Sequence, residues 1–464
     1  MPGISRRSFV AGSAALLATP AVVSGDEIAD VPVAIIGAGA AGIAAARRLR
    51  DAKVRFAMVD AADRVGGRCF TDSATFAVPF DRGAHWIHRF DDNPLVKAAN
   101  GNGLDIYPAP RGQKLRVPPR RARAGETEQF FAALVRANRA IVDAGHGRGD
   151  VAAASALPGD LADWRDSVEF VLGPYSVGKA LSEVSAADFA RAPERNADAF
   201  CREGYGALLA RLARGLTVQL STPARKFDWG GALLIDTPRG TIRARTAIVT
   251  VSTAVLAQGS LGFTPDLPKS HADAASRLSL GQQEQIAVET DGNPLDLDAD
   301  DLVFEKSSGG RTAALLGNIA GGHLSVVTVG GKLARDLARG GEGALKDFAV
   351  EWLTNMFGSD AKGMIKRSAA TGWGVNPLIG GAFSVAAPGQ ADARRVLMSP
   401  LRDRVWFAGE ACHETLWGTV NGAWESGVRA AEAALRVVGG LPPPPSKEKP
   451  AREEKPKRRR RRED

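Results

Sequence analysis

The hydrophobic pattern of the chain begins with a strand, a glycine turn, a helix and a second strand. Residues 31–37 form an unbroken apolar run that ends in glycine, which is typical of a buried strand. Residues 40–52 are Ala-rich with helical spacing, and residues 54–60 return to a strand pattern. This order predicts a β-α-β unit with a parallel sheet.

The rest of the chain alternates between helical and strand-like segments. Residues 91–200 are rich in Ala and Arg, and 127–145 is predicted to be helical. Because α/β character recurs near the start, middle and end, we expect one domain to be discontinuous in sequence. Further helices are predicted at 204–216, 342–357 and after Asn421, and strands at 217–220, 231–238, 243–252, 285–291, 312–319, 323–329 and 403–411.

Composition is that of an ordinary globular protein, and most of the charge lies at the two ends. The 464 residues are 44% hydrophobic and 24% charged. Of the net charge of +8, residues 1–25 carry +2 and residues 446–464 carry +5, which leaves +1 for the body. A nucleic-acid partner is therefore not expected. The three cysteines lack metal-ligand spacing and are expected to be buried free thiols.

Both ends of the chain have compositions of their own. Residues 1–25 contain Arg6 and Arg7 before a short apolar run, which resembles a twin-arginine export signal and predicts a periplasmic or secreted protein. The run is too short to span a membrane, and no later stretch reaches that length. Residues 441–464 are rich in Pro and charge, which predicts a disordered basic tail. The twin-arginine route carries folded proteins, so a cofactor would be bound before export.

Three glycines stand between the first predicted strand and its helix. Gly37, Gly39 and Gly42 have the spacing G-x-G-x-x-G, which permits a tight turn, close approach to a pyrophosphate and close helix packing. Asp60 ends the second strand, where a carboxylate accepts hydrogen bonds from a ribose. A glycine triplet alone is a weak signal, but this combination predicts a dinucleotide site.

A second motif follows at 63–71, where Gly66, Gly67 and Arg68 stand together. It resembles the second signature of the FAD-containing amine oxidase superfamily. The resemblance continues, in the family's order, through 81–95, 204–229, 263–268, 371–389 and 405–435. It implies an α/β fold in which a discontinuous Rossmann-like FAD-binding domain (26–90, 201–268 and 396–440) carries an inserted α+β substrate-binding domain (91–200 and 269–395).

The resemblance also assigns residues to the cofactor. Asp60 would hold the adenosine ribose, Arg68 the phosphates, and Ala224 the adenine through its backbone. Ala382 stands where some members have a flavin-linking Cys, which implies noncovalent FAD. The implied FAD-binding positions are Gly37, Gly39, Gly42, Asp60, Arg68, Gly83, Ala84, His85, Trp86, Ala224, Gly409, Glu410, Thr419 and Val420.

On the substrate side, residues 83–88 and 418–423 most resemble polyamine oxidases and flavin-type lysine demethylases, although Asn421 replaces the usual His. Phe383 supplies one half of the family's aromatic cage, where Thr419 takes the other Tyr position. Gln285 stands where most members have a Lys that holds a water beside flavin N5. The implied catalytic residues are His88, Gln285, Phe383 and Trp417, with Trp86 and Trp373 as further apolar walls.

We therefore expect oxidation of a small-molecule amine, with hydride passing from the α-carbon to flavin N5, hydrolysis of the imine, and reoxidation by O2 or another acceptor. Three alternatives stay open: an L-amino-acid oxidase, which would need an Arg for the substrate carboxylate, a desaturase of the same superfamily, and a non-catalytic exported flavin-binding protein. No Ser/His/Asp or metal constellation is expected. The sequence leaves the oligomeric state open.

Overall fold

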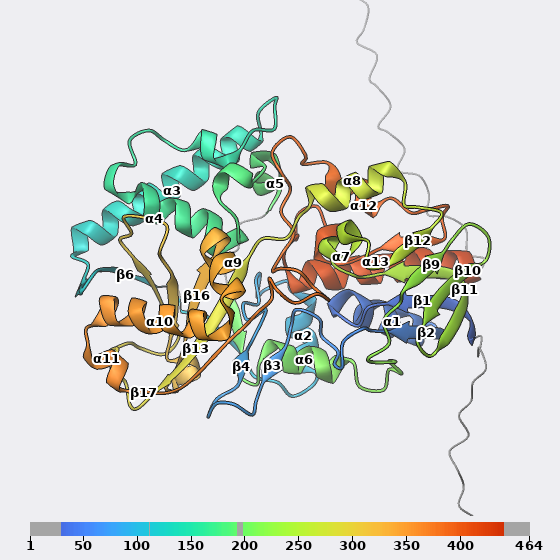
Figure 1. Cartoon of the computed structure of the whole chain (residues 1–464), viewed down its shortest axis with the longest axis horizontal. Helices are drawn as coiled ribbons and strands as arrows, with labels where there is room; N and C mark the ends of the chain where they lie inside the picture. The colour runs from blue at the N-terminus through green and yellow to red at the C-terminus, as the bar shows by residue number, and fades with distance from the viewer. Residues whose placement is uncertain (1–28, 111, 193–197, 440–464) are drawn as a thin grey trace, which may run out of the picture.

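The computed structural model describes residues 29–110, 112–192 and 198–439, so the predicted export signal and basic tail lie outside the described residues. The described chain is elongated and consists of two parts side by side, each built around a seven-stranded sheet (Figure 1). The first part contains both the N-terminal strand and the C-terminal helix, and the second part is formed mainly by the middle of the chain.

The first sheet contains the predicted β-α-β unit. Its order is β12–β9–β10–β11–β1–β2, with β18 paired to β11. Along β1, Val33 and Ile35 point into one core while Ala34 and Ile36 point into another. A strand buried on both faces explains the continuous apolar run in the sequence. The strands are β1 (Ala29–Ile36), β2 (Phe56–Val59), β9 (Lys226–Asp228), β10 (Leu233–Thr237), β11 (Gly240–Val249), β12 (Gly262–Thr264) and β18 (Val405–Phe407).

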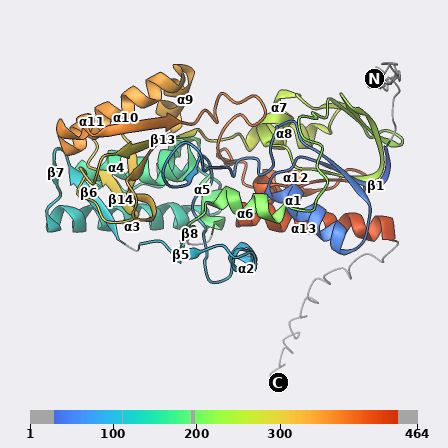
Figure 2. The same cartoon turned by 90° about the horizontal axis from the view of Figure 1, so that it is seen from below.

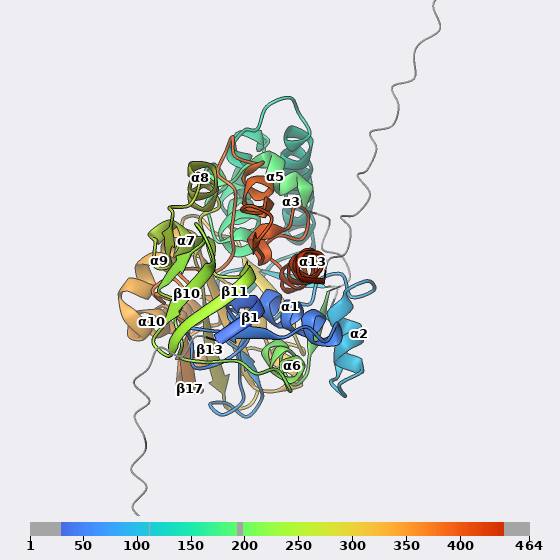
Figure 3. The same ribbon diagram turned by 90° about the vertical axis from the view of Figure 1, so that its right-hand side faces the viewer.

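Helices cover both faces of this sheet (Figure 3). One face packs against α1 (Ala40–Asp51), α6 (Tyr205–Leu212) and α13 (Val420–Gly439). The other packs against α7 (Thr253–Gln258), α8 (Lys269–Arg277) and α12 (Ala393–Met398). Helix α1, near the start of the described chain, therefore lies against helix α13, at its end. The two ends of the described chain are thus packed together in the first part.

The second sheet has the order β17–β13–β16–β15–β14–β6–β7. Figure 2 shows α10 (Gly341–Phe357) and α11 (Asp360–Gly363) on one side of it and α3 (Ala124–Gly145) on the other. Helix α9 (Gly331–Arg339) packs in the same hydrophobic core as α10, and α4 (Arg165–Phe170) packs in the same core as α3. The strands are β6 (Gln113–Val117), β7 (Arg120–Arg121), β13 (Gln283–Thr290), β14 (Asp301–Glu305), β15 (Ala314–Gly317), β16 (Leu324–Gly330) and β17 (Ile365–Ala370).

Short elements connect the two parts. Two two-stranded sheets pair β3 (Thr71–Asp72) with β4 (Phe80–Asp81) and β5 (Ile106–Pro108) with β8 (Ala199–Cys201). Helix α2 (Pro94–Asn100) begins at the N-cap Asn93, whose side chain accepts the N–H of Leu95, and helix α5 (Ala186–Arg191) begins similarly after Ser185. A π-helical turn, η3 (Val171–Tyr175), follows α4, and a 3-10 turn, η6 (Glu410–Cys412), follows β18.

Most of the predicted elements are confirmed, and one is wrong. The segment 217–220 forms only an isolated bridge between Gln219 and Val59. The two-domain α/β architecture is confirmed, while the residue boundaries of the domains stay a prediction. The packing of α8 and α12 on the first sheet bears on those boundaries, because α8 and the first half of α12 lie in the segment predicted for the substrate-binding domain, 269–395. None of the helices within the described residues is long and apolar enough to cross a membrane.

Candidate active site

A cavity of about 1520 Å³ extends from the glycine turn after β1 to the face of the second sheet. Every predicted FAD-binding residue except Gly42 lines it, and so do His88, Gln285 and Phe383. Residues separated by hundreds of positions in sequence thus border one continuous space. The cavity is large enough for a dinucleotide and a small substrate together.

The glycine turn occupies one end of the cavity. Gly37 has φ +107°, and a Cβ on Gly42 would lie 1.9 Å from the carbonyl oxygen of Gly37. These two glycines are therefore required by the turn and by the packing of α1. A Cβ on Gly39 would meet only the Cα of Gly67, at 3.9 Å, so the cavity comes close to the backbone there. This is the arrangement that admits a pyrophosphate.

Asp60 is fixed beside the turn by two backbone groups. Its carboxylate accepts the N–H of Ala38, within the glycine turn, and the N–H of Ala62 at 2.7 Å. Burial raises the pKa of Asp60, and these two hydrogen bonds oppose the rise. The carboxylate lines the cavity, where it is positioned to accept a ribose hydroxyl.

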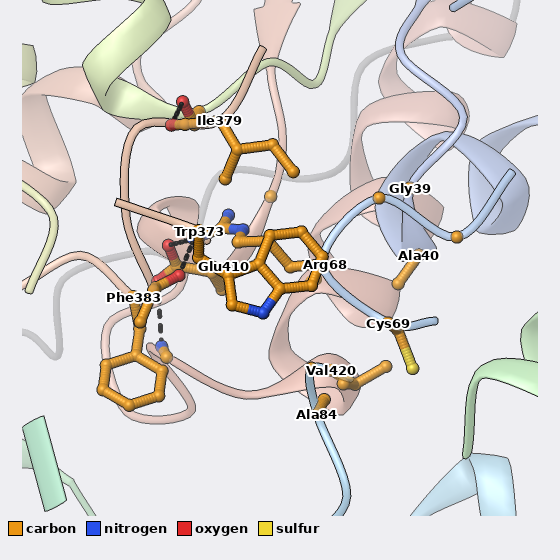
Figure 4. Close-up of a pocket in the computed structure, with 18 of the residues that line it drawn as sticks. Gly39, Ala40, Arg68, Cys69, Ala84, Trp373, Ile379, Phe383, Glu410 and Val420 are labelled. Carbon is orange, nitrogen blue, oxygen red and sulfur yellow. Dashed lines mark hydrogen bonds and ion pairs between the residues drawn. The ribbon is translucent and has the colours of Figure 1, made fainter. Parts of the chain in front are cut away.

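Arg68 joins segments from both ends of the chain. Its Nη1 donates to Glu410 Oε1 at 2.9 Å and to the carbonyl oxygen of Ala382. Glu410 also accepts from the backbone N–H of Ser384 and Gly418. Burial alone would raise the pKa of Glu410, but the guanidinium groups of Arg68 and Arg394 hold it below its usual value. Arg68 and Glu410 therefore fix the loops that border the cavity, as Figure 4 shows.

Two helices point their N-termini at the cavity. Helix α1 begins at Ala40 beside the glycine turn, and α13 begins at Val420, which also lines the cavity. Neither helix has an acidic residue in its first turn, and the positive end of each helix dipole faces the cavity. Together with the space at Gly39 and at Gly409, where a Cβ would meet nothing within 4 Å, this fits a long anionic cofactor such as FAD.

Aromatic side chains form walls at the end away from the glycine turn. Phe383 and Trp373 come from the segment that follows β17, and Figure 4 shows both among the lining residues. Trp373 Nε1 donates to the carbonyl oxygen of Arg82 at 2.6 Å, which fixes its ring. Trp86 lines the same space and packs edge-on against Phe200, with ring centroids 4.7 Å apart. These rings supply an apolar wall for a substrate chain.

Two polar side chains border this aromatic region. Strand alternation along β13 puts Gln285 on the cavity side, and its Nε2 donates to the carbonyl oxygen of Gly83 at 3.1 Å. His88 Nδ1 is 2.9 Å from Asp198 Oδ1. The predicted residues His88, Gln285 and Phe383 are therefore brought together, as a substrate site requires.

Trp417 does not belong to this group. It is 2% exposed, it is not among the residues that line the cavity, and its Nε1 donates to the carbonyl oxygen of Asp188. Its ring packs against the guanidinium of Arg394, 4.7 Å from the centroid. Although Gly418 and Thr419 reach the cavity, the side chain of Trp417 turns into the core. Its predicted place in the apolar wall is a wrong expectation.

Sequence reasoning missed several residues of the site. Asp81 accepts from His85, Asp198 contacts His88, and Tyr175 lines the cavity from η3. Glu284 accepts the backbone N–H groups of Trp373 and Gly374, which positions the loop that carries the indole wall. The spacing of Asp81 four residues before His85 was the available signal. Asp198 and Tyr175 stand in no motif.

Comparison with known proteins agrees with this geometry. Residues 154–435 match the model of the flavin containing amine oxidoreductase family, and residues 35–99 match an NAD(P)-binding Rossmann-like domain. The chain belongs to the flavin-containing amine oxidoreductase family. The family match spans more than half of the chain, and FAD is accordingly its cofactor.

Individual relatives are distant. Polyamine oxidase 2 of Arabidopsis thaliana is 24% identical over 86% of this chain and 87% of its own length. Lysine-specific histone demethylase 2 of Homo sapiens is 25% identical over 86% of this chain, which spans about half (53%) of that protein. Among solved structures, wild-type putrescine oxidase bound to putrescine has a TM-score of 0.73 at 18% identity, covering 87% of this chain and 98% of that one. Cyclohexylamine oxidase of Brevibacterium oxydans has a TM-score of 0.71 at 20% identity, over 88% and 100%.

We expect the cofactor to be noncovalent. Ala382 lines the cavity where the family's linking thiol would stand, and the thiols of Cys201 and Cys412 do not line it. Cys69 does line it, but it lies beside Gly67 in the glycine-rich region. Acid precipitation should release all of the yellow flavin into the supernatant, measured by its absorbance. Flavin colour that stays with the protein pellet would contradict this prediction.

Proposed function

We propose that this protein oxidises a small aliphatic amine that carries a second cationic group, which is the kind of substrate that polyamine oxidases oxidise. The observation that carries the proposal is the distribution of charge along the cavity. Asp198 borders the aromatic region and Asp91 stands at an exposed edge of the cavity. Cationic lining side chains among the described residues are Arg64 and Arg68.

Neither arginine suits a substrate carboxylate. Arg68 is paired with Glu410, and Arg64 packs over Phe70 with its charge close to Asp60. The described part of the cavity therefore favours an amine over an L-amino acid, which requires a cation for its carboxylate. This arrangement argues against the L-amino-acid oxidase alternative and supports a substrate with positive charge at both ends.

Different lining side chains bind different parts of the substrate. The rings of Trp86, Trp373 and Phe383 contact the methylene chain and exclude water from it. The carboxylate of Asp198, held by His88, attracts the distal ammonium group. When bound, FAD supplies the two-electron oxidation that converts the amine to an imine, which water hydrolyses to a carbonyl product. The acceptor that then takes the electrons is O2 or another oxidant.

An anaerobic screen tests this proposal. Putrescine, spermidine, cyclohexylamine and L-leucine are each mixed with the FAD-loaded protein while the flavin absorbance is recorded. We expect the flavin to bleach with putrescine or spermidine, and much more slowly with L-leucine. Bleaching by none of these amines would favour the non-catalytic flavin-binding alternative, and bleaching by L-leucine alone would favour an amino-acid oxidase.

Asp198→Asn provides a sharper test of the distal-charge site. We expect the KM for the preferred diamine to rise about fivefold, close to 1 kcal/mol, with kcat little changed. The lost charge interaction is one that binds the distal ammonium group and does not take part in the chemical step. The KM for cyclohexylamine should not change, since it has a single amine. Asp160→Asn is the matched control, because Asp160 pairs with Arg136 at an exposed position. Equal effects on both amines would contradict the assignment of Asp198.

Export by the twin-arginine route is part of the proposal. It is supported by Arg6 and Arg7 before the apolar run of residues 9–23. The receptor reads the guanidinium pair and not charge alone, so the double substitution of both arginines by Lys should leave the precursor in the cytoplasm. Cell fractionation measures this, and normal periplasmic yield of the Lys-Lys variant would disprove it.

A further inference from the structure

A second, small cavity lies behind the wall of the large one. Its volume of about 20 Å³ is enough for one water molecule. Six of its lining residues also line the large cavity, so the two spaces are neighbours: His85, Trp86, Tyr175, Gln285, Leu302 and Thr328. All of the remaining lining residues except Asp81 are apolar, and Ala314, Leu316 and Val326 among them come from the second sheet.

His85, which lines this space, carries one hydrogen-bond acceptor without a partner in the described part of the chain. Its Nδ1 lies 2.9 Å from Oδ2 of the buried Asp81, and that carboxylate also accepts the backbone N–H of Tyr205. Because a carboxylate accepts, the Nδ1 proton is held toward Asp81, and Nε2 is left with its lone pair. The ring is stacked on Phe200 at 4.5 Å between centroids. Nε2 is buried and has no hydrogen-bond partner among the described residues.

Gln285 presents a second acceptor. Its Nε2 donates to the carbonyl oxygen of Gly83, and this hydrogen bond distinguishes the nitrogen of the amide from its oxygen. Its Oε1 is buried, and within the described chain it has no partner either. A buried acceptor without a donor is unfavourable, because it has lost the hydrogen bonds that water would give it. Two such acceptors beside a space for one water match the two donors of a single water molecule.

We propose that His85 and Gln285 bind one water molecule in the small cavity, and that His85, oriented by Asp81, is the base that accepts the substrate proton through this water. The proposal rests on the proposed amine oxidation. An aliphatic ammonium has to lose a proton before its α-carbon can be oxidised. One N–H bond of the ammonium breaks as an O–H bond forms on the water, while one O–H bond of the water breaks as Nε2–H forms. The ammonium becomes an amine and the imidazole becomes an imidazolium, so charge is conserved.

The charges around His85 suit this role. Asp81 lies 2.9 Å from the ring and the carboxylate of Asp300 is also close to it, so a proton taken up by Nε2 would have negative charge nearby. Tyr175 also lines the small cavity, and burial raises its pKa, so the phenol stays neutral. Gln285 supplies no charge, so it does not oppose protonation of His85. A lysine at position 285 would do so.

A crystal structure of the FAD-loaded protein, at a resolution that shows ordered water, tests the binding site directly. We expect one water within hydrogen-bond distance of both His85 Nε2 and Gln285 Oε1. Electron density that shows no water at this position would overturn the proposal, whatever the substrate proves to be. This measurement is independent of turnover, so a failure of the proposed function would be recognised separately.

The role of His85 as a base is tested by the pH dependence of flavin bleaching with putrescine, and with spermidine in parallel. His85→Asn keeps a donor near Asp81 but removes the titrating nitrogen. Without the base only free amine reacts, and an aliphatic amine with a pKa near 10.4 is about 0.1% neutral at pH 7.5. We expect bleaching at pH 7.5 to slow about tenfold or more, and the deficit to shrink to less than about fourfold near pH 10, where about 30% of the amine is already neutral.

His271→Asn is the matched control. His271 is also buried, its ring lies 5.7 Å from that of Phe407, and it does not line either cavity. We expect its pH profile to match the wild type even if its stability is lower. A rate deficit in His85→Asn that is the same at pH 7.5 and pH 10 would indicate a merely structural role and overturn the assignment. If neither amine bleaches the wild type, the base role fails together with the proposed function, while the water site is judged from the crystal structure.

Discussion

Arg394→Leu is expected to lower the free energy of unfolding by about 3–5 kcal/mol, the cost of leaving a buried charge without its partner. Arg394 is fully buried on α12, and its Nε and Nη2 each donate to Asp188 at 2.8 Å. Its Nη1 donates to Ser384 Oγ at 2.9 Å, and the same hydroxyl donates to Glu410 at 2.7 Å. The substitution therefore leaves Asp188 uncompensated and also loosens the loop that holds Glu410. Chemical denaturation followed by tryptophan fluorescence measures the loss.

The neighbouring residue provides the control. Arg395 lies on the same helix but is exposed, where it pairs with Glu414 and Asp392, so Arg395→Leu should cost less than about 1 kcal/mol. The double variant Asp188→Leu, Arg394→Leu should recover part of the loss, because it removes both buried charges. Equal destabilisation by the two single Arg variants would show that the buried pair contributes nothing special. Flavin content should fall in Arg394→Leu before the protein unfolds, since Arg68 and Glu410 border the cavity.

The parts of the site that sequence predicts well are those made by local geometry. Gly37, Gly39, Gly42 and Asp60 lie in one β-α-β unit, so their spacing along the chain determines their arrangement in space. The turn, the close packing at Gly42 and the hydrogen bonds of Asp60 all follow from that unit. Because each family motif has its own local structure, the order of the motifs also predicts which loops near the end of the chain reach the cavity.

The parts that sequence does not predict are those made by packing between distant segments. The pair Asp81–His85 is local, but the cavity it borders is closed by β13 to β16, about 200 residues later. Trp417 stands beside residues that reach the cavity, yet its direction is decided by Asp188 and Arg394, which no motif contains. Such side-chain directions depend on the assembled core and leave no periodic trace in the sequence.

Gln285→Lys is expected to speed the reaction of the reduced protein with oxygen at least tenfold. Gln285 lines the cavity at the position where the resemblance to the family implies a lysine, and it contributes no charge there. Oxygen becomes negatively charged as it takes up an electron, and a fixed cation in a water-poor cavity stabilises that charge. An effect of only about 1.4 kcal/mol on the barrier gives tenfold. The nearby carboxylate of Asp81, which also lines the small cavity, helps to keep the new ammonium charged against the cost of burial.

Stopped-flow mixing separates the two halves of the reaction. Reduction by the preferred amine should slow in Gln285→Lys near neutral pH, because the lysine removes the Gln285 acceptor for the water beside His85 and its charge opposes protonation of that ring. The rise in the reoxidation rate is therefore read from the oxidative mix alone. Gln285→Met has a similar size and no charge, so it should leave reoxidation as slow as in the wild type. Fast reoxidation in both variants would assign the effect to a change in packing. Unchanged reoxidation in Gln285→Lys would mean that the position is not the family's lysine site, or that a cation elsewhere in the chain already stabilises the charge on oxygen.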